Sequence, residues 1–279
     1  MITIVASIVS AVGAGVILHL IITEIRDPVR IRRVISASDP VVPATLELYQ
    51  GLFPEDDGTN YSVEEFMDSM DTVPAEQRHV QVRNIIHVAT FKGAVVGFLF
   101  AHFYPDRRKA IVSYFAVDKN VKEARVDSVA ALKLTSALIK TLRKTGKCDA
   151  VFYDVERIGV SAPAEQKRRK MGRAGLFRAR VKSLKLEARE FKFQYQCPKV
   201  SLSEFAHEEP FALFCVGLHS AVPRQLPKKT ILEYLRFVYL DCYGDMYPVE
   251  DPRFSTHQEH LRQMVQHYEE TLPDVVVAA

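Results

Sequence analysis

Apolar and polar residues alternate with a period of two along several stretches of the chain, which is typical of β-strands. The turn sequences KG and PDRRK separate three of these stretches, so these three are expected to form consecutive antiparallel strands. The pattern predicts one mixed sheet, with strands over residues 29–37, 85–92, 94–104, 110–118, 148–156, 189–198 and 209–218.

Residues 127–144 instead show apolar positions three and four apart, which predicts a long helix. Asp127 or Ser128 is expected to cap its start, and lysine and arginine fill its last turn. Because this helix connects the strand at 110–118 to the strand at 148–156, those two strands should run parallel. Shorter helices are predicted over 43–53, 62–70 and 163–175, and Ser62 with Glu65 forms a capping box for the second of these.

The tail, residues 221–279, is expected to be a helical extension with helices over 228–243 and 255–270. The first helix carries an apolar face that packs on the domain or on a partner, and Ser255 with Gln258 forms a capping box for the second. The tail histidines are most simply a solvated face rather than a metal site, because no carboxylate or cysteine lies at ligand spacing from them. An oligomer contact is the favoured functional interpretation of the tail. The apolar face comprises Ile231, Leu235, Val238 and Cys242, and the histidines are His257, His260 and His267.

The N-terminal residues 1–23 are uncharged and long enough to cross a hydrocarbon core of about 30 Å. Four arginines follow this run and no basic residue precedes it, which predicts a single transmembrane helix with the N-terminus outside and the main domain in the cytoplasm. A buried helix that packs on a partner is the alternative. The expected organisation is a transmembrane helix over 1–25, a globular domain over 26–220 and the extension over 221–279.

Composition adds few constraints. Of the 279 residues, 48% are hydrophobic and 25% are charged, as in ordinary globular proteins, and a net charge of +3 does not indicate nucleic acid. The four cysteines form no CxxC pair, which argues against a zinc knuckle or a disulfide framework and fits a reducing compartment. No metal site is predicted.

Two charged segments have more than one interpretation. The acidic stretch 55–71 is most simply a solvated face, and its functional alternative is a lip that attracts a cationic substrate. The basic segment 167–192 is most simply a solvated helix and hairpin. Contact with anionic lipid head groups ranks second, and RNA binding ranks last because no RNA-binding signature is present.

The order of predicted elements resembles the GNAT superfamily of acyl-CoA-dependent N-acyltransferases over residues 29–220. The family's turn [QR]-x-x-G-x-[GA] is matched at its ends by Arg125 and Ala130, with Ser128 in place of the usual glycine. DVE at 154–156, KRRKMGRAGLFR at 167–178 and YQCP at 195–198 resemble later pieces of the family in order. The resemblance implies an α/β (α+β) fold in which a GNAT-like mixed central sheet has helices on both faces.

The resemblance also implies that acetyl-CoA is the acyl donor and binds where the fourth strand meets the long helix. A helix N-terminus offers unpaired N–H groups and partial positive charge to a phosphate, and Lys122 and Arg125 add formal charge. Glu123 and Asp127 oppose an anion, and an ordinary helix start is the alternative. The expected cofactor-binding residues are Phe115, Val117, Lys122, Arg125, Val126, Asp127, Ser128, Val129 and Ala130.

Acyl transfer to an amine needs a base for the ammonium proton and an acid for the departing thiolate. The resemblance points to Glu156, at the end of the fifth strand, as the base. The family's usual acid is a tyrosine, but Met171 stands at that position, and Tyr153 and Tyr114 are substitutes by proximity only. Two classes of function remain: a membrane-anchored N-acetyltransferase acting on a cytoplasmic amine, and a noncatalytic membrane-tethered binding or assembly module.

Overall fold

The computed structural model describes residues 29–53, 66, 82–118, 120–121, 125–156, 177–198, 211–246, 249–250 and 252–279. The predicted N-terminal helix over 1–23, the helix over 163–175 and, apart from Phe66, the helix over 62–70 lie outside these residues. None of the helices in the described ranges combines the length and the apolar character that crossing a membrane requires.

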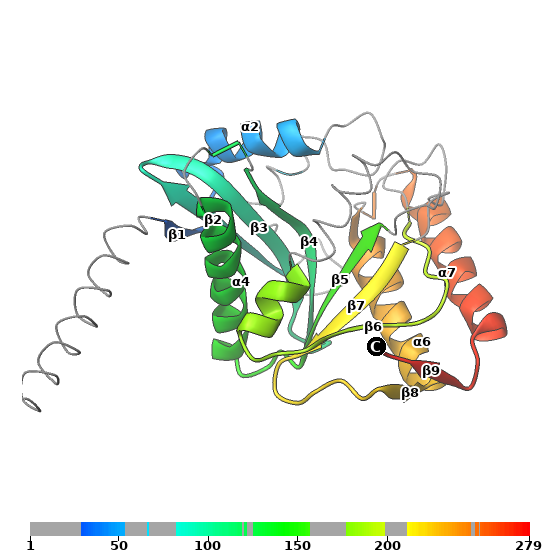
Figure 1. Ribbon diagram of the computed structural model, residues 1–279. Helices are drawn as coiled ribbons and strands as arrows, with labels where there is room; N and C mark the ends of the chain where they lie inside the picture. The colour runs from blue at the N-terminus through cyan, green and yellow to red at the C-terminus, as the bar shows by residue number, and fades with distance from the viewer. Residues whose placement is uncertain are drawn as a thin grey trace, which may run out of the picture.

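In the described part of the chain, seven strands form one mixed sheet (Figure 1). Its order is β1 (Arg30–Val34), β2 (Arg83–Phe91), β3 (Ala94–Tyr104), β4 (Lys109–Val117), β5 (Ala150–Glu156), β7 (Phe211–Gly217) and β6 (Ala188–Glu190). Only β4 and β5 pair in parallel within this sheet, and the other neighbours are antiparallel. The three predicted antiparallel strands and the parallel crossover are therefore confirmed.

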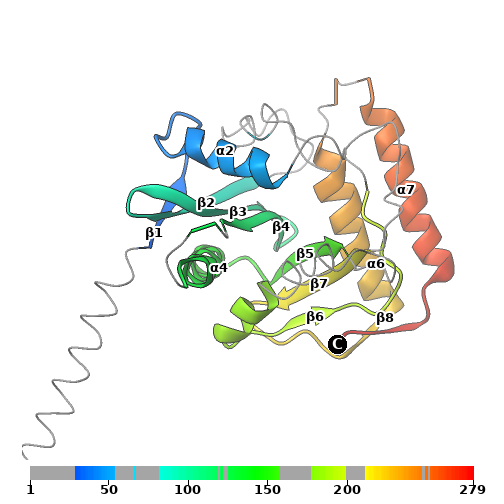
Figure 2. The ribbon, with the colours of Figure 1, turned by 45° about the horizontal axis from the view of Figure 1, so that its top comes forward.

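Helices cover both faces of the sheet, which is why its central strands are nearly continuous apolar runs (Figure 2). On one face, Leu134 and Leu138 of α4 (Val126–Lys144) pack with Leu99 of β3. On the other face, α2 (Val42–Leu52) places Tyr49 against Phe98. The expected mixed sheet with helices on both faces is confirmed.

The start of α4 differs from the prediction. The helix begins at Val126 after Arg125, which adopts a left-handed conformation with φ of 71°, and no side chain caps it. Asp127 and Ser128 lie inside the first turn, and the Asp127 carboxylate accepts a bond from the adjacent Ser128 backbone N at 2.6 Å. A carboxylate two residues earlier, at the N-cap position of Arg125, would have served the predicted capping role. Arg143 and Lys144 fill the last turn as predicted.

The tail is a mixed structure rather than a purely helical one. It contains β8 (Gln225–Pro227), α6 (Lys228–Arg236), the π-helix η3 (Phe237–Tyr243), the 3-10 turn η4 (Gly244–Met246), α7 (Phe254–Thr271) and β9 (Val275–Val277). The predicted helix over 228–243 therefore changes its winding after Arg236. Its residues Ile231, Leu235 and Val238 are fully buried against the chain's own sheet. The oligomer contact stays a prediction.

The start of α7 also lacks the predicted capping box. No side chain caps this helix, because its N-cap position is Arg253 and Ser255 lies inside the first turn. The Gln258 amide donates instead to the Gly244 carbonyl oxygen at 2.8 Å. The expected solvated face is wrong for His257, which is buried with its Nε2 2.8 Å from the Tyr243 carbonyl oxygen. Within the described ranges, no group of three or more histidine, cysteine, aspartate or glutamate side chains is placed to hold a metal ion.

The last residues extend the sheet beyond β6. The backbone N of Lys192 donates to the Val277 carbonyl at 2.8 Å, and Glu190 and Ala279 exchange two backbone bonds of 2.9 Å. On its other side β9 pairs with β8. The predicted strand over 189–198 is accordingly short, because only Ala188–Glu190 pairs with β7 in a regular ladder before the chain turns toward the tail.

A buried histidine between β2 and α4 is expected to make stability depend on pH. Burial, and secondarily the charge of Arg33, lower the pKa of His87 from 6.5 to about 4. Between pH 6.5 and about pH 4, His87 is protonated in the unfolded chain but neutral in the folded chain. The free energy of unfolding therefore falls as the pH falls through this window. We expect wild type to lose about 1–2 kcal/mol more than His87→Gln between pH 7 and pH 5.

Urea unfolding at the two pH values measures this difference. His219→Gln is the matched control, since His219 is exposed. An identical pH dependence in wild type and His87→Gln would contradict the assignment.

Candidate functional site

The strands β4 and β5 separate toward their C-terminal ends. They pair at only three positions, Lys109 with Ala150, Ala110 with Val151 and Ile111 with Phe152. Both strands continue beyond these pairs, β4 to Val117 and β5 to Glu156, and Figure 1 shows them diverging. In open α/β sheets, ligands gather at the C-terminal ends of parallel strands, so this divergence is the first candidate for a binding site.

A β-bulge explains the separation. Val112 faces Ala101 of β3 and Tyr114 faces Phe100, so Ser113 is an extra residue in β4. It comes two residues after Ile111, the last β4 residue that pairs with β5. A bulge bends its strand, and here it turns the end of β4 away from β5. The polar Ser113 within the apolar run of β4 is the feature of the sequence at this bend.

Beyond the bulge, β4 presents backbone groups toward β5. The Asp118 backbone N bonds to the Val96 carbonyl of β3 at 2.9 Å. Since backbone groups alternate in direction along a strand, those of Tyr114 and Ala116 also face β3, and those of Phe115 and Val117 face the opposite edge. No described strand pairs with β4 at that edge beyond Ile111. Phe115 and Val117, both predicted cofactor residues, thus offer N–H and C=O groups to an extended ligand.

The side chains of these two residues have a structural role. Phe115 packs its ring edge against Phe177 with 5.7 Å between centroids, and Val117 is buried beside Gly97. The backbone groups of Phe115 and Val117 therefore remain the polar groups that these residues offer to a ligand.

Arg125 stands at the start of α4, on the chain that leaves β4. It is exposed, and its left-handed backbone is unusual for a residue with a side chain. Such strained positions cluster at ligand-binding turns. Its neighbour in the prediction, Lys122, lies outside the described residues. Of the two cations predicted at this turn, the structure therefore describes Arg125, whose side chain is exposed.

The first turn of α4 is the predicted anion site. The N–H groups of Val126, Asp127 and Ser128 precede Val129, whose N makes the first helical bond, to the Arg125 carbonyl at 2.9 Å. Asp127 already occupies the Ser128 N–H. A phosphate at this turn must therefore displace the Asp127 carboxylate or bind beside it. Ala130, another predicted cofactor residue, is fully buried and packs in the core beneath α4.

The two predicted catalytic residues lie on β5. Glu156 ends the strand, opposite Phe211 of β7, and its side chain lies outside what the structure describes. Tyr153 is buried on the α4 side of the sheet, where its ring stacks on Phe214 at 4.8 Å and meets Phe177 at 4.6 Å. Its hydroxyl has no hydrogen-bond partner among the described residues, and burial raises its pKa well above the ordinary value.

Sequence reasoning missed a polar cluster around Asp154, between these two residues. Its carboxylate oxygen Oδ2 accepts bonds from the Tyr195 hydroxyl at 2.9 Å and the Tyr243 hydroxyl at 2.8 Å, with the Cys197 thiol at 3.6 Å. Tyr243 belongs to η3, 89 residues further along the chain. No local pattern signals a contact over that separation, although DVE and YQCP each contribute to the resemblance.

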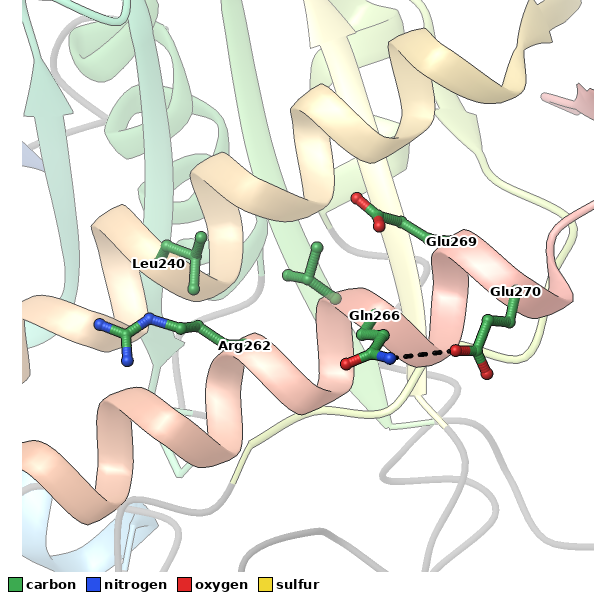
Figure 3. A pocket seen from close by; sticks show the side chains of 6 residues that line it. Leu240, Arg262, Gln266, Glu269 and Glu270 are labelled. Atoms are coloured by element: carbon green, nitrogen blue, oxygen red, sulfur yellow. Dashed lines mark hydrogen bonds between the residues drawn. The ribbon is translucent and has the colours of Figure 1, made fainter.

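Two hollows elsewhere on the surface, each of about 380 Å³, include none of the predicted site residues. Figure 3 shows the one between η3 and α7. There Gln266 donates to Glu270 at 3.1 Å and Arg236 pairs with Glu269, so its polar side chains satisfy one another. The other hollow lies between α4 and Leu184.

Comparisons with known proteins find similar folds and no sequence relative. No protein-family model matches the sequence, and a search of curated proteins finds no match. Among solved structures, the chain is similar to an aminoglycoside 6'-N-acetyltransferase complexed with coenzyme A, with 14% identity, 70% of this chain and 99% of that chain covered, and a TM-score of 0.42.

Two further structures show the same level of similarity. One is the ribosomal-protein-S18-alanine N-acetyltransferase from Escherichia coli, at 17% identity over 70% of this chain and 96% of that one, with a TM-score of 0.40. The other is a tandem GNAT protein from the clavulanic acid biosynthesis pathway, at 16% identity over 85% and 65% of the two chains, also with a TM-score of 0.40. Since these TM-scores are below 0.5, the function of this chain is inferred from its own strand order and contacts.

Proposed function

We propose that this protein is an N-acetyltransferase that transfers an acetyl group from acetyl-CoA to an amine. The divergence of β4 and β5 after the Ser113 bulge carries the proposal. It leaves a strand edge that no described strand pairs with, at the C-terminal ends of two parallel strands and directly before the N-terminus of a long helix. An extended amide-containing chain that ends in phosphates fits this combination, and the resemblance of the sequence to GNAT enzymes points to the same ligand.

In this proposal the pantetheine arm lies along β4 and bonds to the backbone of Phe115 and Val117. The pyrophosphate sits at the first turn of α4, where N–H groups and the helix dipole favour negative charge. Arg125 adds a charge-assisted bond, and Lys122 is the second cation that the sequence predicts there. The acetyl thioester then lies in the space between β4 and β5.

The chemistry needs a proton acceptor beside the thioester, because an amine attacks only after its ammonium form has lost a proton. A carboxylate at the C-terminal end of β5 has the right chemical character, and Glu156 is the residue to which the resemblance points. The transfer joins the amine nitrogen to the acetyl carbon and breaks the carbon–sulfur bond. The products are an amide and free coenzyme A.

Release of the coenzyme A thiol tests the proposal. Full-length protein would be incubated with acetyl-CoA and butylamine, lysine or a lysine-containing peptide, and thiol would be followed against a heat-denatured control. We expect amine-dependent release and micromolar binding of acetyl-CoA by calorimetry. Binding without release for any amine would favour the noncatalytic module, and absence of both would overturn the proposed function.

We further propose that residues 1–23 anchor the protein in a membrane with the described domain on the cytoplasmic side. The uncharged run and the arginines that follow it support this arrangement. Nearly all of the full-length protein is expected to stay in the membrane pellet after alkaline carbonate extraction. Release into the soluble fraction would contradict the anchor, and protease protection of an N-terminal tag in sealed vesicles tests the orientation.

A further inference from the structure

The Asp154 cluster lies at the diverging part of β5. Phe152 is the last β5 residue that pairs with β4, and Asp154 follows two residues later. Asp154 and Tyr243 are half-buried, whereas Tyr195 behind them is fully buried. Asp154 thus keeps part of its surface exposed, while its carboxylate is held against the enclosed Tyr195.

All three hydrogen bonds from side chains go to one oxygen. Oδ2 accepts from Tyr195, Cys197 and Tyr243, and Oδ1 receives no bond from a described side chain. Oδ2 is therefore held in a fixed orientation by its donors, while Oδ1 is the oxygen that can take up a proton. A base needs this combination of a fixed carboxylate with one available oxygen.

The described side chains in contact with the carboxylate are neutral. It is faced by Tyr195 and Cys197 from the segment after β6 and by Tyr239, Cys242 and Tyr243 from η3. No lysine, arginine or histidine among the described residues pairs with it. Burial consequently raises the pKa of Asp154, and the hydroxyl donors offset part of that rise.

We propose that Asp154 is the catalytic base of the acetyl transfer and that Tyr243 of the tail positions its carboxylate. This inference rests on the proposed function and assigns to Asp154 the role for which the resemblance pointed to Glu156. It also gives the tail a part in the site, because η3 supplies a hydroxyl 2.8 Å from the reacting carboxylate.

The proton balance of the step is complete. The acceptor arrives as an ammonium ion, an N–H bond breaks and an O–H bond forms on Asp154. The neutral amine then attacks the thioester carbon, and the carbon–sulfur bond breaks with its electron pair leaving on sulfur. The thiolate takes the second proton that the nitrogen loses, and Asp154 later releases its own proton to water.

Tyr243 tunes this base through its hydrogen bond. The bond stabilises the charged carboxylate and so lowers its pKa. Removing the hydroxyl in Tyr243→Phe raises the pKa of Asp154. Because activity requires the ionised carboxylate, the acidic limb of the pH–rate profile moves to higher pH, by about one unit for the loss of one hydrogen bond.

The decisive experiment compares matched carboxylate variants of the full-length protein in the thiol-release assay. Asp154→Asn is expected to lower kcat at pH 7 by about a hundredfold or more, with the acetyl-CoA affinity unchanged by calorimetry. The matched control is Asp149→Asn, because Asp149 is exposed and lies just before the start of β5. This variant should keep kcat within about twofold of wild type. Glu156→Gln is measured in parallel as the rival base.

A second readout does not depend on turnover. In protein labelled with ¹³C at aspartate carboxyls, the Asp154 signal is identified by its loss in Asp154→Asn. It should titrate above the ordinary value of about 3.9, and higher still in Tyr243→Phe. Titration at or below the ordinary value would overturn the assignment.

The outcomes separate the two claims. Wild type that neither binds acetyl-CoA nor releases thiol overturns the proposed function and this inference with it. Wild type that transfers acetyl groups while Asp154→Asn keeps full turnover, with the loss found in Glu156→Gln, overturns the inference alone.

Discussion

Arg125→Glu is expected to weaken acetyl-CoA binding by more than about tenfold, which corresponds to about 1.4 kcal/mol or more. The substitution places a repelling charge where Arg125 now stands exposed at the start of α4. Both residues carry a Cβ, so the cost of the left-handed backbone is similar in the two proteins and the difference reports on charge. Calorimetry with acetyl-CoA measures it.

Two further variants sharpen this test. Asp127→Asn removes the negative charge that now holds the Ser128 N–H, so it should change affinity in the opposite direction, by about two- to fivefold. Lys144→Glu makes the same change of charge as Arg125→Glu in the last turn of α4 and should leave affinity within about twofold. Equal affinities in all the variants would show that this turn is an ordinary helix start.

Gly97→Val is expected to destabilise the fold by about 3 kcal/mol and to weaken acetyl-CoA binding. A Cβ at Gly97 would meet Val117 Cγ1 at 2.7 Å and the Ala116 carbonyl oxygen at 2.8 Å. The carbonyl belongs to the backbone, so β3 and β4 must move apart at residues 116 and 117. Those residues end the strand along which the pantetheine arm is proposed to lie.

The matched control for this effect is Gly51→Ala in α2. No atom lies within 4 Å of a Cβ at Gly51, so this change should stabilise the helix by about 0.5–1 kcal/mol. Urea unfolding compares the two. A Gly97→Val protein as stable as wild type would mean that the end of β4 is not packed against β3 in this way.

The sequence predicted the regular elements near the site because their signals are local. The period of two in β4 and the three-to-four spacing in α4 depend on neighbouring residues, and both elements appear with bounds within a residue of the prediction. The parallel pairing of β4 with β5 followed from the helix between them. The cap of α4 was predicted wrongly, since Asp127 and Ser128 lie within the first turn.

The polar cluster could not be predicted for a different reason. Asp154, Tyr195 and Tyr243 come from three separate segments, and only the packing of η3 on the sheet brings their oxygens together. The change from α-helix to π-helix after Arg236 sets where Tyr243 points, and no residue pattern in 228–243 signals that change. Glu156 was accessible to sequence reasoning because the end of a strand is a local feature, and its role stays a prediction.

Hydrogen exchange of the β4 amides, with and without acetyl-CoA, tests the central claim most directly. The N–H groups of Phe115 and Val117 face the separation between β4 and β5, whereas those of Tyr114 and Ala116 bond toward β3 and serve as internal controls. Saturating acetyl-CoA is predicted to slow exchange at Phe115 and Val117 by about tenfold or more and to leave Tyr114 and Ala116 unchanged. Unchanged exchange at Phe115 and Val117 in the presence of bound acetyl-CoA would contradict the account.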